Sequence, residues 1–411
     1  MKQANGKWVI GEDFWGRESE IQILNTRICE GAHTLLVAQR RMGKTSLMHE
    51  LIRRLGIENQ CICLFVDFQK SKDASDAIVE LSLSTKSHQP LWNKTKEAFK
   101  NIFQTASNKI ESINLQEVGI KLRAGLTTAN WRDKGDEIFQ LLATADRPVI
   151  LFWDEVPILI NRILKGDDYH ITPQRRAQAD AFLSWLRDNS LKYQKTIHIF
   201  LTGSIGLEPI LRQAGLSATI NNFVPFELKP WDKATAQGCL NQLARNYGII
   251  LYEGVTDSVV DHLGYCIPHH VQMFFSHIHD YCLRKKVKEF RVDEVKTVYE
   301  TEMLSIRGHA ELSHYEERLK MVLGEERFKI ALDILTEASI GNGISITVLK
   351  KLQEWGGYPM DVLREVLWVL EHDGYLTCDR DCYSFNSKLL KDWWRSRNSL
   401  FFTRVSDRKS S

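Results

Sequence analysis

Residues 38–46 read A-Q-R-R-M-G-K-T-S, and this stretch decides the fold of the chain. An apolar run at residues 35–37 precedes it, and residues 47–55 place apolar side chains at helical spacing. A strand, a tight loop and a helix in this order are the setting of the phosphate-binding loop G-x-x-x-x-G-K-[ST], with Ala38 at the place of the first glycine. A helix that contains Lys-Thr near its start by chance is the alternative. The flanking strand and amphipathic helix favour a nucleotide site.

Each part of this loop has an expected role in holding phosphates. Backbone N–H groups would surround the phosphates, and the positive end of the new helix would point at them. Gly43 lets the backbone approach closely, Lys44 would reach the β and γ phosphates, and the Thr45 hydroxyl would bind Mg²⁺. The residues predicted to bind the nucleotide in this loop are Ala38, Gln39, Arg40, Arg41, Met42, Gly43, Lys44, Thr45 and Ser46.

The chain has 411 residues, which is too many for one core and indicates two or three domains. Its formal net charge of +2 gives no overall attraction to nucleic acid or to an anionic membrane. The longest apolar run, residues 149–160, is interrupted by acids and a proline and does not read as a membrane span. The N-terminus shows no charged-then-apolar leader, and the eight cysteines include no C-x-x-C pair. We therefore expect reduced thiols, no zinc site and a cytoplasmic location.

A second chemical signature is the run P-V-I-L-F-W-D-E at residues 148–155. In a parallel sheet the acids at its end would lie at the carboxyl edge, where the phosphate loop also opens. Asp154 would then bind Mg²⁺, and Glu155 would be the catalytic base that polarises the attacking water. Two acids at a strand end can instead cap the following helix. Their position downstream of a phosphate loop favours the catalytic interpretation.

Other segments extend this predicted α/β core. Residues 61–68 and 196–204 are apolar runs typical of strands buried on both faces of a parallel sheet. The long connection at 71–146 is predicted to be an insertion, in which residues 113–124 nearly alternate between apolar and polar and favour a half-buried hairpin over a helix. Basic residues surround this hairpin, but glutamates lie among them, which favours a solvated face over a nucleic-acid surface.

From residue 226 the pattern turns helical, and residues 226–312 are predicted to form a helical lid. Residues 313–400 are predicted to form a winged-helix domain, because three helical patterns there are followed by a hairpin. The helical patterns occupy 328–338, 346–355 and 360–372, and the hairpin turn lies at 379–381.

A winged helix often binds DNA, but the charges of this one oppose it. The third helix carries Asp361, Glu365 and Glu371 against a single Arg364. Affinity for duplex DNA comes largely from Lys and Arg that neutralise phosphates, so we predict a protein-facing or regulatory module. The basic residues near the end of the chain, including the predicted basic tail at 401–411, keep DNA as an alternative. They are Lys388, Lys391, Arg395, Arg397, Arg404, Arg408 and Lys409.

The run F-W-G-R-E-S-E at residues 14–20 resembles the G-R-E-x-E box of AAA+ ATPases in the origin-recognition and STAND (signal-transduction ATPase) groups. This resemblance implies that Phe14, Gly16 and Arg17 lie near the adenine. The run G-Y-C-I-P at residues 264–268 resembles the G-x-P element of the STAND lid, whose proline packs near the adenine, so Pro268 is a further expected binding residue.

The same resemblance implies roles for residues after the strand at 196–204. Ser204, or Thr202 two residues earlier, matches the polar residue that orients the lytic water in AAA+ proteins. Arg212 stands where this superfamily often carries an arginine finger toward a neighbouring subunit, and a solvated helix arginine is the alternative. The arginine that many other AAA+ lids bring to the γ-phosphate is not visible here. His269 and His270 are a candidate substitute or a structural pair.

These elements occur in the order of that superfamily along nearly the whole chain, which resembles small STAND-type ATPases of bacteria and archaea that end in a winged helix. The predicted fold class is α/β. A three-layer P-loop NTPase core with a parallel sheet at residues 1–225 is followed by the helical lid and the winged-helix domain. Two departures, Ala38 and the missing lid arginine, imply slow hydrolysis.

The predicted function is an ATP-driven switch that acts through lid and winged helix, with ATP or ADP and Mg²⁺ as cofactors. The alternatives are a DNA-binding ATPase of the origin-recognition or transposition-targeting kind and a degenerate ATPase that holds its nucleotide structurally. The predicted partners are the nucleotide and a protein bound through the winged helix, with self-assembly in the ATP state left open.

Overall fold

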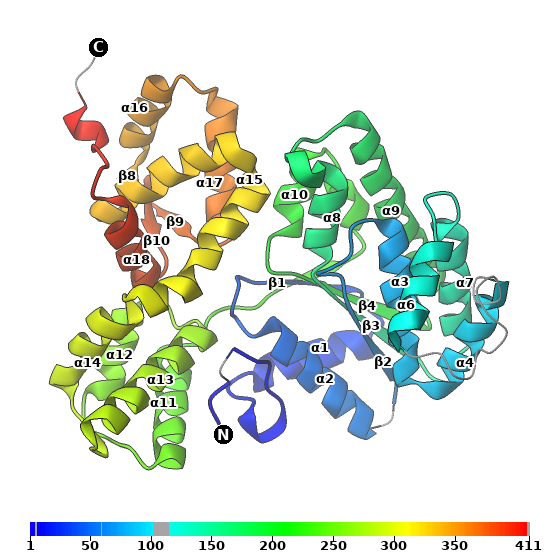
Figure 1. Cartoon of the computed structure of the whole chain (residues 1–411), viewed down its shortest axis with the longest axis horizontal. Coiled ribbons are helices and arrows are strands. Elements are labelled where there is room, and N and C mark those ends of the chain that lie inside the picture. Colours follow the sequence, from blue (N-terminus) through cyan, green and yellow to red (C-terminus); the bar gives the residue numbers. More distant parts are fainter. Residues whose placement is uncertain (5, 59, 102–114, 409–411) are drawn as a thin grey trace. The chain divides into compact units, whose positions relative to one another are not determined.

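The computed structural model describes residues 1–4, 6–58, 60–101 and 115–408 (Figure 1). The chain forms two compact units. The core unit comprises residues 17–38 and 44–228, and the helical unit comprises residues 1–16, 39–43 and 229–411. The middle of the predicted phosphate loop therefore belongs to the helical unit, although the residues on either side of it belong to the core unit.

A five-stranded parallel sheet forms the centre of the core unit, in the order β2-β3-β4-β1-β5. Every residue of β3 and of β4 is buried, as expected of apolar runs in a sheet covered on both faces. The strands are β1 (Thr34–Val37), β2 (Ile62–Asp67), β3 (Val149–Asp154), β4 (Ile197–Thr202) and β5 (Val224–Glu227). Because all five run in the same direction, their carboxyl ends share one edge of the sheet.

Helices cover both faces of this sheet and complete three layers. Figure 1 shows α1 and α2 on one side of the sheet and α8 and α9 on the other. The helices of the core unit are α1 (Glu18–Cys29), α2 (Lys44–Glu58), α3 (Ala74–Ser84), α4 (Gln89–Ala98), α6 (Leu115–Gly125), α7 (Trp131–Ala143), α8 (Val156–Lys165), α9 (Pro173–Lys192) and α10 (Leu207–Gln213). The three-layer α/β core predicted from the sequence is confirmed.

The hairpin predicted at residues 113–124 is wrong over the part that the structure describes. Residues 113 and 114 lie outside the described ranges, and the rest of the segment belongs to the helix α6. Val118, Leu122 and Leu126 are buried at a spacing of four residues, whereas Ile120 is 65% exposed. On a helix, side chains four residues apart lie on the same face. Val118 and Leu122 therefore share the buried face of α6, and Ile120 faces solvent.

Helices make up most of the other unit. They are α11 (Lys233–Tyr247), α12 (Val255–Leu263), α13 (Pro268–Lys285), α14 (Val292–Val298), α15 (Ile306–Ile340), α16 (Ile346–Gly356), α17 (Met360–His372) and α18 (Lys388–Asn398). Two short strands, β6 (Ile250–Leu251) and β7 (Glu289–Phe290), pair in parallel within the region predicted to be a wholly helical lid. The long helix α15 passes through residues 312 and 313 and kinks at Gly324, whose φ is +73°. The predicted domain boundary at 312/313 falls inside this helix and stays a prediction.

The C-terminal part contains the three predicted helices and the predicted hairpin. Strands β8 (Ile344–Ser345), β9 (Leu376–Asp379) and β10 (Cys382–Phe385) form an antiparallel sheet in the order β8-β10-β9. Arg380 and Asp381, between β9 and β10, both have positive φ, as a two-residue hairpin turn requires. Trp393 and Trp394 are fully buried and pack α18 against the rest of this part. Across the described ranges, no helix is both long and apolar enough to pass through a membrane.

Candidate nucleotide site

The predicted phosphate loop connects β1 to α2, and its backbone has the strained turns that such a loop needs. Arg41 and Gly43 have φ values of +68° and +87°, in the left-handed region. At Gly43 an added Cβ would meet no atom within 4 Å, so glycine is required there for its conformation and not for space. The loop ends where α2 begins at Lys44, so the N-terminus of this helix, the positive end of its dipole, lies at the loop.

The side chain of Lys44 is buried against this loop. Its side chain is 7% exposed, and its Nζ donates a hydrogen bond to the carbonyl oxygen of Ala38 at 2.8 Å. Ala38 occupies the place of the usual first glycine, so this carbonyl marks the start of the loop. A buried ammonium group at this position supplies a positive charge for a negatively charged ligand.

Thr45 and Asp154 come together as the sequence predicted. The Thr45 hydroxyl donates to Oδ2 of Asp154 at 3.0 Å, across 109 positions of the chain. Asp154 is 7% exposed, and its pKa is raised to about 6, mainly by burial and then by the neighbouring charge of Glu155. The charge of Lys44 and the bond from Thr45 act in the opposite direction. The group is therefore a carboxylate at neutral pH that would gain from a nearby cation.

Glu155 is held in a defined orientation beside Asp154. Its backbone is left-handed, with a φ of +58°, which is uncommon for a glutamate and typical of functional sites. Its Oε2 accepts two hydrogen bonds from Ser204, one from the backbone N–H at 2.9 Å and one from the hydroxyl at 2.8 Å. Of the two alternatives, Ser204 and Thr202, only Ser204 has a hydrogen bond to Glu155 among the described contacts. Their roles toward a lytic water stay predictions.

Two further residues of this edge were missed by the sequence analysis. Asp67 ends β2 directly opposite Asp154 in the strand register, and its charge helps to raise the pKa of Asp154. Gly203 precedes Ser204, and a Cβ there would collide with the ring of Pro157, so the approach of β4 to α8 requires a glycine. The sequence signal for Asp67 is an acid at the end of an apolar strand. That Asp67 lies beside Asp154 follows only from the strand order, which the sequence does not give.

Residues 39 and 41 of the loop bond to other parts of the helical unit. Gln39 Nε2 donates to the carbonyl oxygen of Gly374 at 2.7 Å. Arg41 pairs with Glu311 and also contacts His269. His269 lies 3.4 Å from Glu311, and this interaction is the main reason that the pKa of Glu311 is lowered to about 2. His269 follows the predicted adenine residue Pro268, which is buried as the first residue of α13.

The predicted adenine residues near the N-terminus have structural partners of their own. Arg17 is buried just before α1 and forms an ion pair with Glu20 at 2.6 Å. Gly16 has a φ of +67°, and a Cβ there would collide with the side chain of Thr235. Phe14 is half-buried. The role of these residues in binding adenine stays a prediction. Arg212 is exposed on α10, and its role as an arginine finger also stays a prediction.

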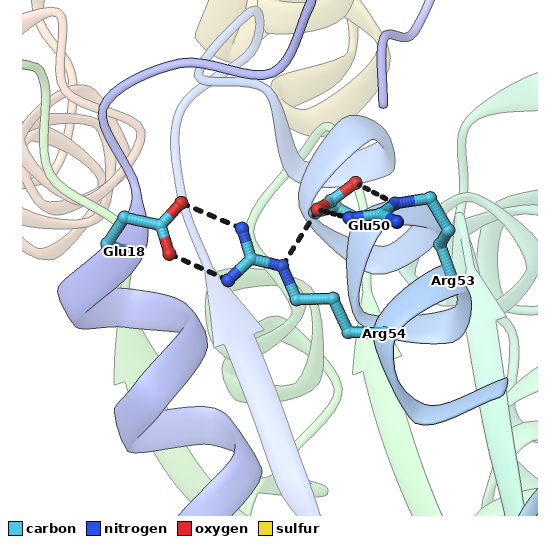
Figure 2. A network of polar contacts seen from close by, with 4 residues as sticks. All are labelled: Glu18, Glu50, Arg53 and Arg54. Carbon is cyan, nitrogen blue, oxygen red and sulfur yellow. Dashed lines mark hydrogen bonds and ion pairs between the residues drawn. The ribbon is translucent and has the colours of Figure 1, made fainter. Parts of the chain in front are cut away.

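An ion-pair network ties α1 to the phosphate-loop helix α2 (Figure 2). Arg54 donates two bonds to the Glu18 carboxylate at 2.6 and 2.7 Å and one to Glu50 at 2.8 Å. Glu50 is only 1% exposed, and Arg53 supplies two more bonds to it. The buried carboxylate is therefore paired on both oxygens, as a buried charge must be. Glu18 is the acid of the G-R-E run, so that run is fixed to α2 by this bridge.

Comparison with known proteins supports the fold. No family model matches the chain, and no curated protein matches its sequence. The chain is similar to the Walker-type ATPase of Pyrococcus abyssi, with 18% identity, a TM-score of 0.60, and coverage of 94% of this chain and 98% of that one. This chain has the fold of a Walker-type ATPase.

Other solved structures match over similar lengths with lower scores. They include the Aeropyrum pernix ORC1 protein in complex with DNA (13% identity, 94% and 93% coverage, TM-score 0.42) and the Thermotoga maritima RuvB branch migration motor (14% identity, 90% and 92% coverage, TM-score 0.43).

The raised pKa of Asp154 predicts a stability cost at neutral pH. An isolated aspartate has a pKa of 3.8, so the folded state binds the Asp154 proton more tightly, and ionisation above pH 6 opposes folding. We expect Asp154→Asn to raise the free energy of unfolding of the ligand-free protein at pH 7.5 by up to about 3 kcal/mol. The gain should vanish below about pH 4. Urea unfolding at both pH values measures it.

The matched control for this prediction is Asp67→Asn at the neighbouring strand end, where the side chain is exposed. We expect a much smaller change for this variant. An Asp154→Asn protein that is less stable than the wild type at pH 7.5 would contradict the electrostatic account.

Proposed function

We propose that the protein is an ATP-binding, slowly hydrolysing switch. The observation that carries this proposal is the cluster at the carboxyl edge of the sheet, where Lys44, Thr45 and Asp154 meet and Glu155 lies next to them. Lys44 would exchange its bond to Ala38 for bonds to the β and γ phosphates. Glu155, oriented by Ser204, would accept a proton from the attacking water.

The residues present fit a magnesium ion. Thr45 and Asp154 offer a hydroxyl and a carboxylate, which are the oxygen ligands that Mg²⁺ accepts alongside phosphates and water. A buried carboxylate with a raised pKa is relieved of repulsion when a cation is nearby, so binding would favour its ionised form. When bound, the ion would neutralise charge on the transferred phosphate.

The switch part of the proposal is supported by the contacts of Gln39 and Arg41 in the helical unit. A triphosphate beside Arg41 would compete with Glu311 for the guanidinium, because both are anionic. Nucleotide binding would therefore change the contacts that the loop makes with α13, α15 and the turn before β9. We propose that this rearrangement, in a lid and a winged helix of the STAND type, is the signal that a protein partner or further copies of the chain detect.

Four of the basic residues near the end of the chain give the DNA-binding alternative little support. Lys388, Arg397 and Arg404 form ion pairs with Asp392, Glu316 and Glu337 at 2.5, 3.0 and 3.1 Å. Arg408 stacks on Trp355, with 4.1 Å between its Cζ atom and the ring centroid. Lys409 lies outside the described residues. Since these side chains already have partners inside the chain, they are poor candidates for a phosphate-binding surface.

The experiment that tests the proposed function compares the wild type with Glu155→Gln. We expect the variant to bind Mg·ATP with an affinity within about threefold of the wild type and to lose at least ~100-fold in turnover, because only the base is removed. Isothermal titration calorimetry and a phosphate-release assay measure the two quantities. Glu208→Gln on the exposed face of α10 is the control. Equal hydrolysis rates in wild type and Glu155→Gln would refute the base assignment.

The variant Glu311→Gln tests the proposed competition between Glu311 and phosphate for Arg41. Removing the charge that competes for Arg41 should tighten binding of Mg·ATP by up to about fivefold, the value of a partly exposed ion pair. Calorimetry measures the change. Glu317→Gln is the matched control, because Glu317 lies on the same helix and pairs only with His314 among the described ion pairs. Unchanged or weaker binding in Glu311→Gln would contradict the competition between Glu311 and phosphate.

A further inference from the structure

Leu400 and Phe401 form an apolar tip at the turn that follows α18. The backbone N–H of Phe402 donates a hydrogen bond to the carbonyl oxygen of Ser399 at 3.2 Å, so Leu400 and Phe401 occupy the two central positions of a β-turn. Their side chains are 80% and 95% exposed, more than any other large apolar side chain in the part of the chain that the structure describes. Central turn positions favour Gly, Asn, Asp, Ser and Pro, so turn formation does not account for this pair.

The chain that follows the tip is fixed to helices of the same unit. Glu337 of α15 is 2% exposed, and its carboxylate accepts hydrogen bonds from Arg404 Nε at 3.1 Å and from the backbone N–H of Val405 at 3.0 Å. Arg408 stacks on Trp355 of α16. A buried carboxylate that is paired on both oxygens holds its partners in one arrangement. The apolar tip therefore stands on a base of defined conformation.

Basic residues are concentrated beside the tip. Residues 388–411 contain seven of the 54 Lys and Arg residues of the chain but only two of its 52 Asp and Glu residues. Lys391 and Arg395 lie four positions apart on one face of α18, which leads to the turn at Ser399. Neither forms an ion pair with any residue that the structure describes, and Arg395 is exposed. Both charges are therefore available to an anionic partner.

The shape and the charge of this region together indicate the class of partner. Leu400 and Phe401 protrude from the surface, so a protein partner would need a pocket shaped to receive them. A fluid bilayer needs no such pocket, because Leu and Phe enter the boundary between headgroups and acyl chains. Basic side chains next to that boundary are attracted to anionic headgroups. A short apolar anchor and a small basic patch are each weak signals, and reversible membrane binding requires both.

We propose that the apolar tip binds the surface of a membrane that contains anionic lipids. Leu400 and Phe401 enter the acyl boundary, and Lys391 and Arg395 contact the lipid phosphates. The net charge of the whole chain is only +2, so the attraction is local to this end of α18. This binding needs neither nucleotide nor hydrolysis, so the proposal stands apart from the proposed ATPase function.

The experiment sediments the full chain with vesicles of phosphatidylcholine and phosphatidylglycerol in equal amounts, and with vesicles of phosphatidylcholine alone. We expect the wild type to bind the anionic vesicles more tightly. Leu400→Ser combined with Phe401→Ser should weaken this binding at least about tenfold, because the buried apolar surface is lost. Ile57→Ser is the matched control, since Ile57 is an apolar side chain of α2 that is 70% exposed, and it should bind like the wild type.

A second arm tests the charges. Lys391→Gln combined with Arg395→Gln should weaken binding to the anionic vesicles about tenfold, and should leave binding to phosphatidylcholine unchanged. Lys286→Gln combined with Lys288→Gln removes the same charge from an exposed segment before β7, and should change binding by less than about twofold.

Three outcomes would overturn the proposal. The first is a wild type that does not sediment with anionic vesicles, or that binds both kinds of vesicle equally. The second is unchanged binding in the tip variant or in the variant of Lys391 and Arg395. The third is a wild type that self-associates without lipid, by analytical ultracentrifugation, while the tip variant does not, because the tip would then be a contact between copies of the chain.

Discussion

The hydrogen bond between the Thr45 hydroxyl and the Asp154 carboxylate is the interaction on which the proposed nucleotide site depends. It joins the first turn of α2 to the end of β3, although β4 lies between β3 and the strand that leads into α2. Such a bond can form only if the strands run parallel and end at the same edge of the sheet. This contact brings the buried Lys44 and the oriented Glu155 to the same edge of the sheet, where the proposed function needs both.

The same edge concentrates features that do not favour stability. Asp67, Asp154 and Glu155 bring three acids to neighbouring positions, and burial raises the pKa of the central one. Glu155 also adopts a left-handed backbone that glutamate rarely takes. Perturbed pKa values and strained residues cluster at functional sites, because a preorganised site holds charges where a ligand will need them. Glu50 is also a buried acid, but Arg53 and Arg54 donate hydrogen bonds to its carboxylate, so its role is structural.

The sequence predicted those parts of the site that follow from local patterns. The phosphate loop and the acid pair each sit at the end of an apolar strand, and the carboxyl-edge rule for parallel sheets brings them together without further information. The segment at 115–124 was misread because Val118 and Leu122 fit both a spacing of two and a spacing of four, and only burial separates the patterns. The role of Asp67 depends on the strand order, which one sequence does not reveal. The pairs of Arg41 with Glu311 and of Gln39 with Gly374 join residues that are hundreds of positions apart, and no local signal marks them.

The central claim is that the Lys44 ammonium group, which here donates a hydrogen bond to the carbonyl oxygen of Ala38, binds the phosphates of ATP. The measurement that tests it most directly is the dissociation constant for Mg·ATP of the wild type and of Lys44→Ala by isothermal titration calorimetry. Lys70→Ala is a control, because Lys70 is an exposed lysine of the same unit. A charge-assisted bond contributes about 1.5–3 kcal/mol, so the account predicts that Lys44→Ala binds roughly tenfold to a hundredfold more weakly. An affinity for Mg·ATP that is the same in Lys44→Ala, Lys70→Ala and the wild type would contradict it.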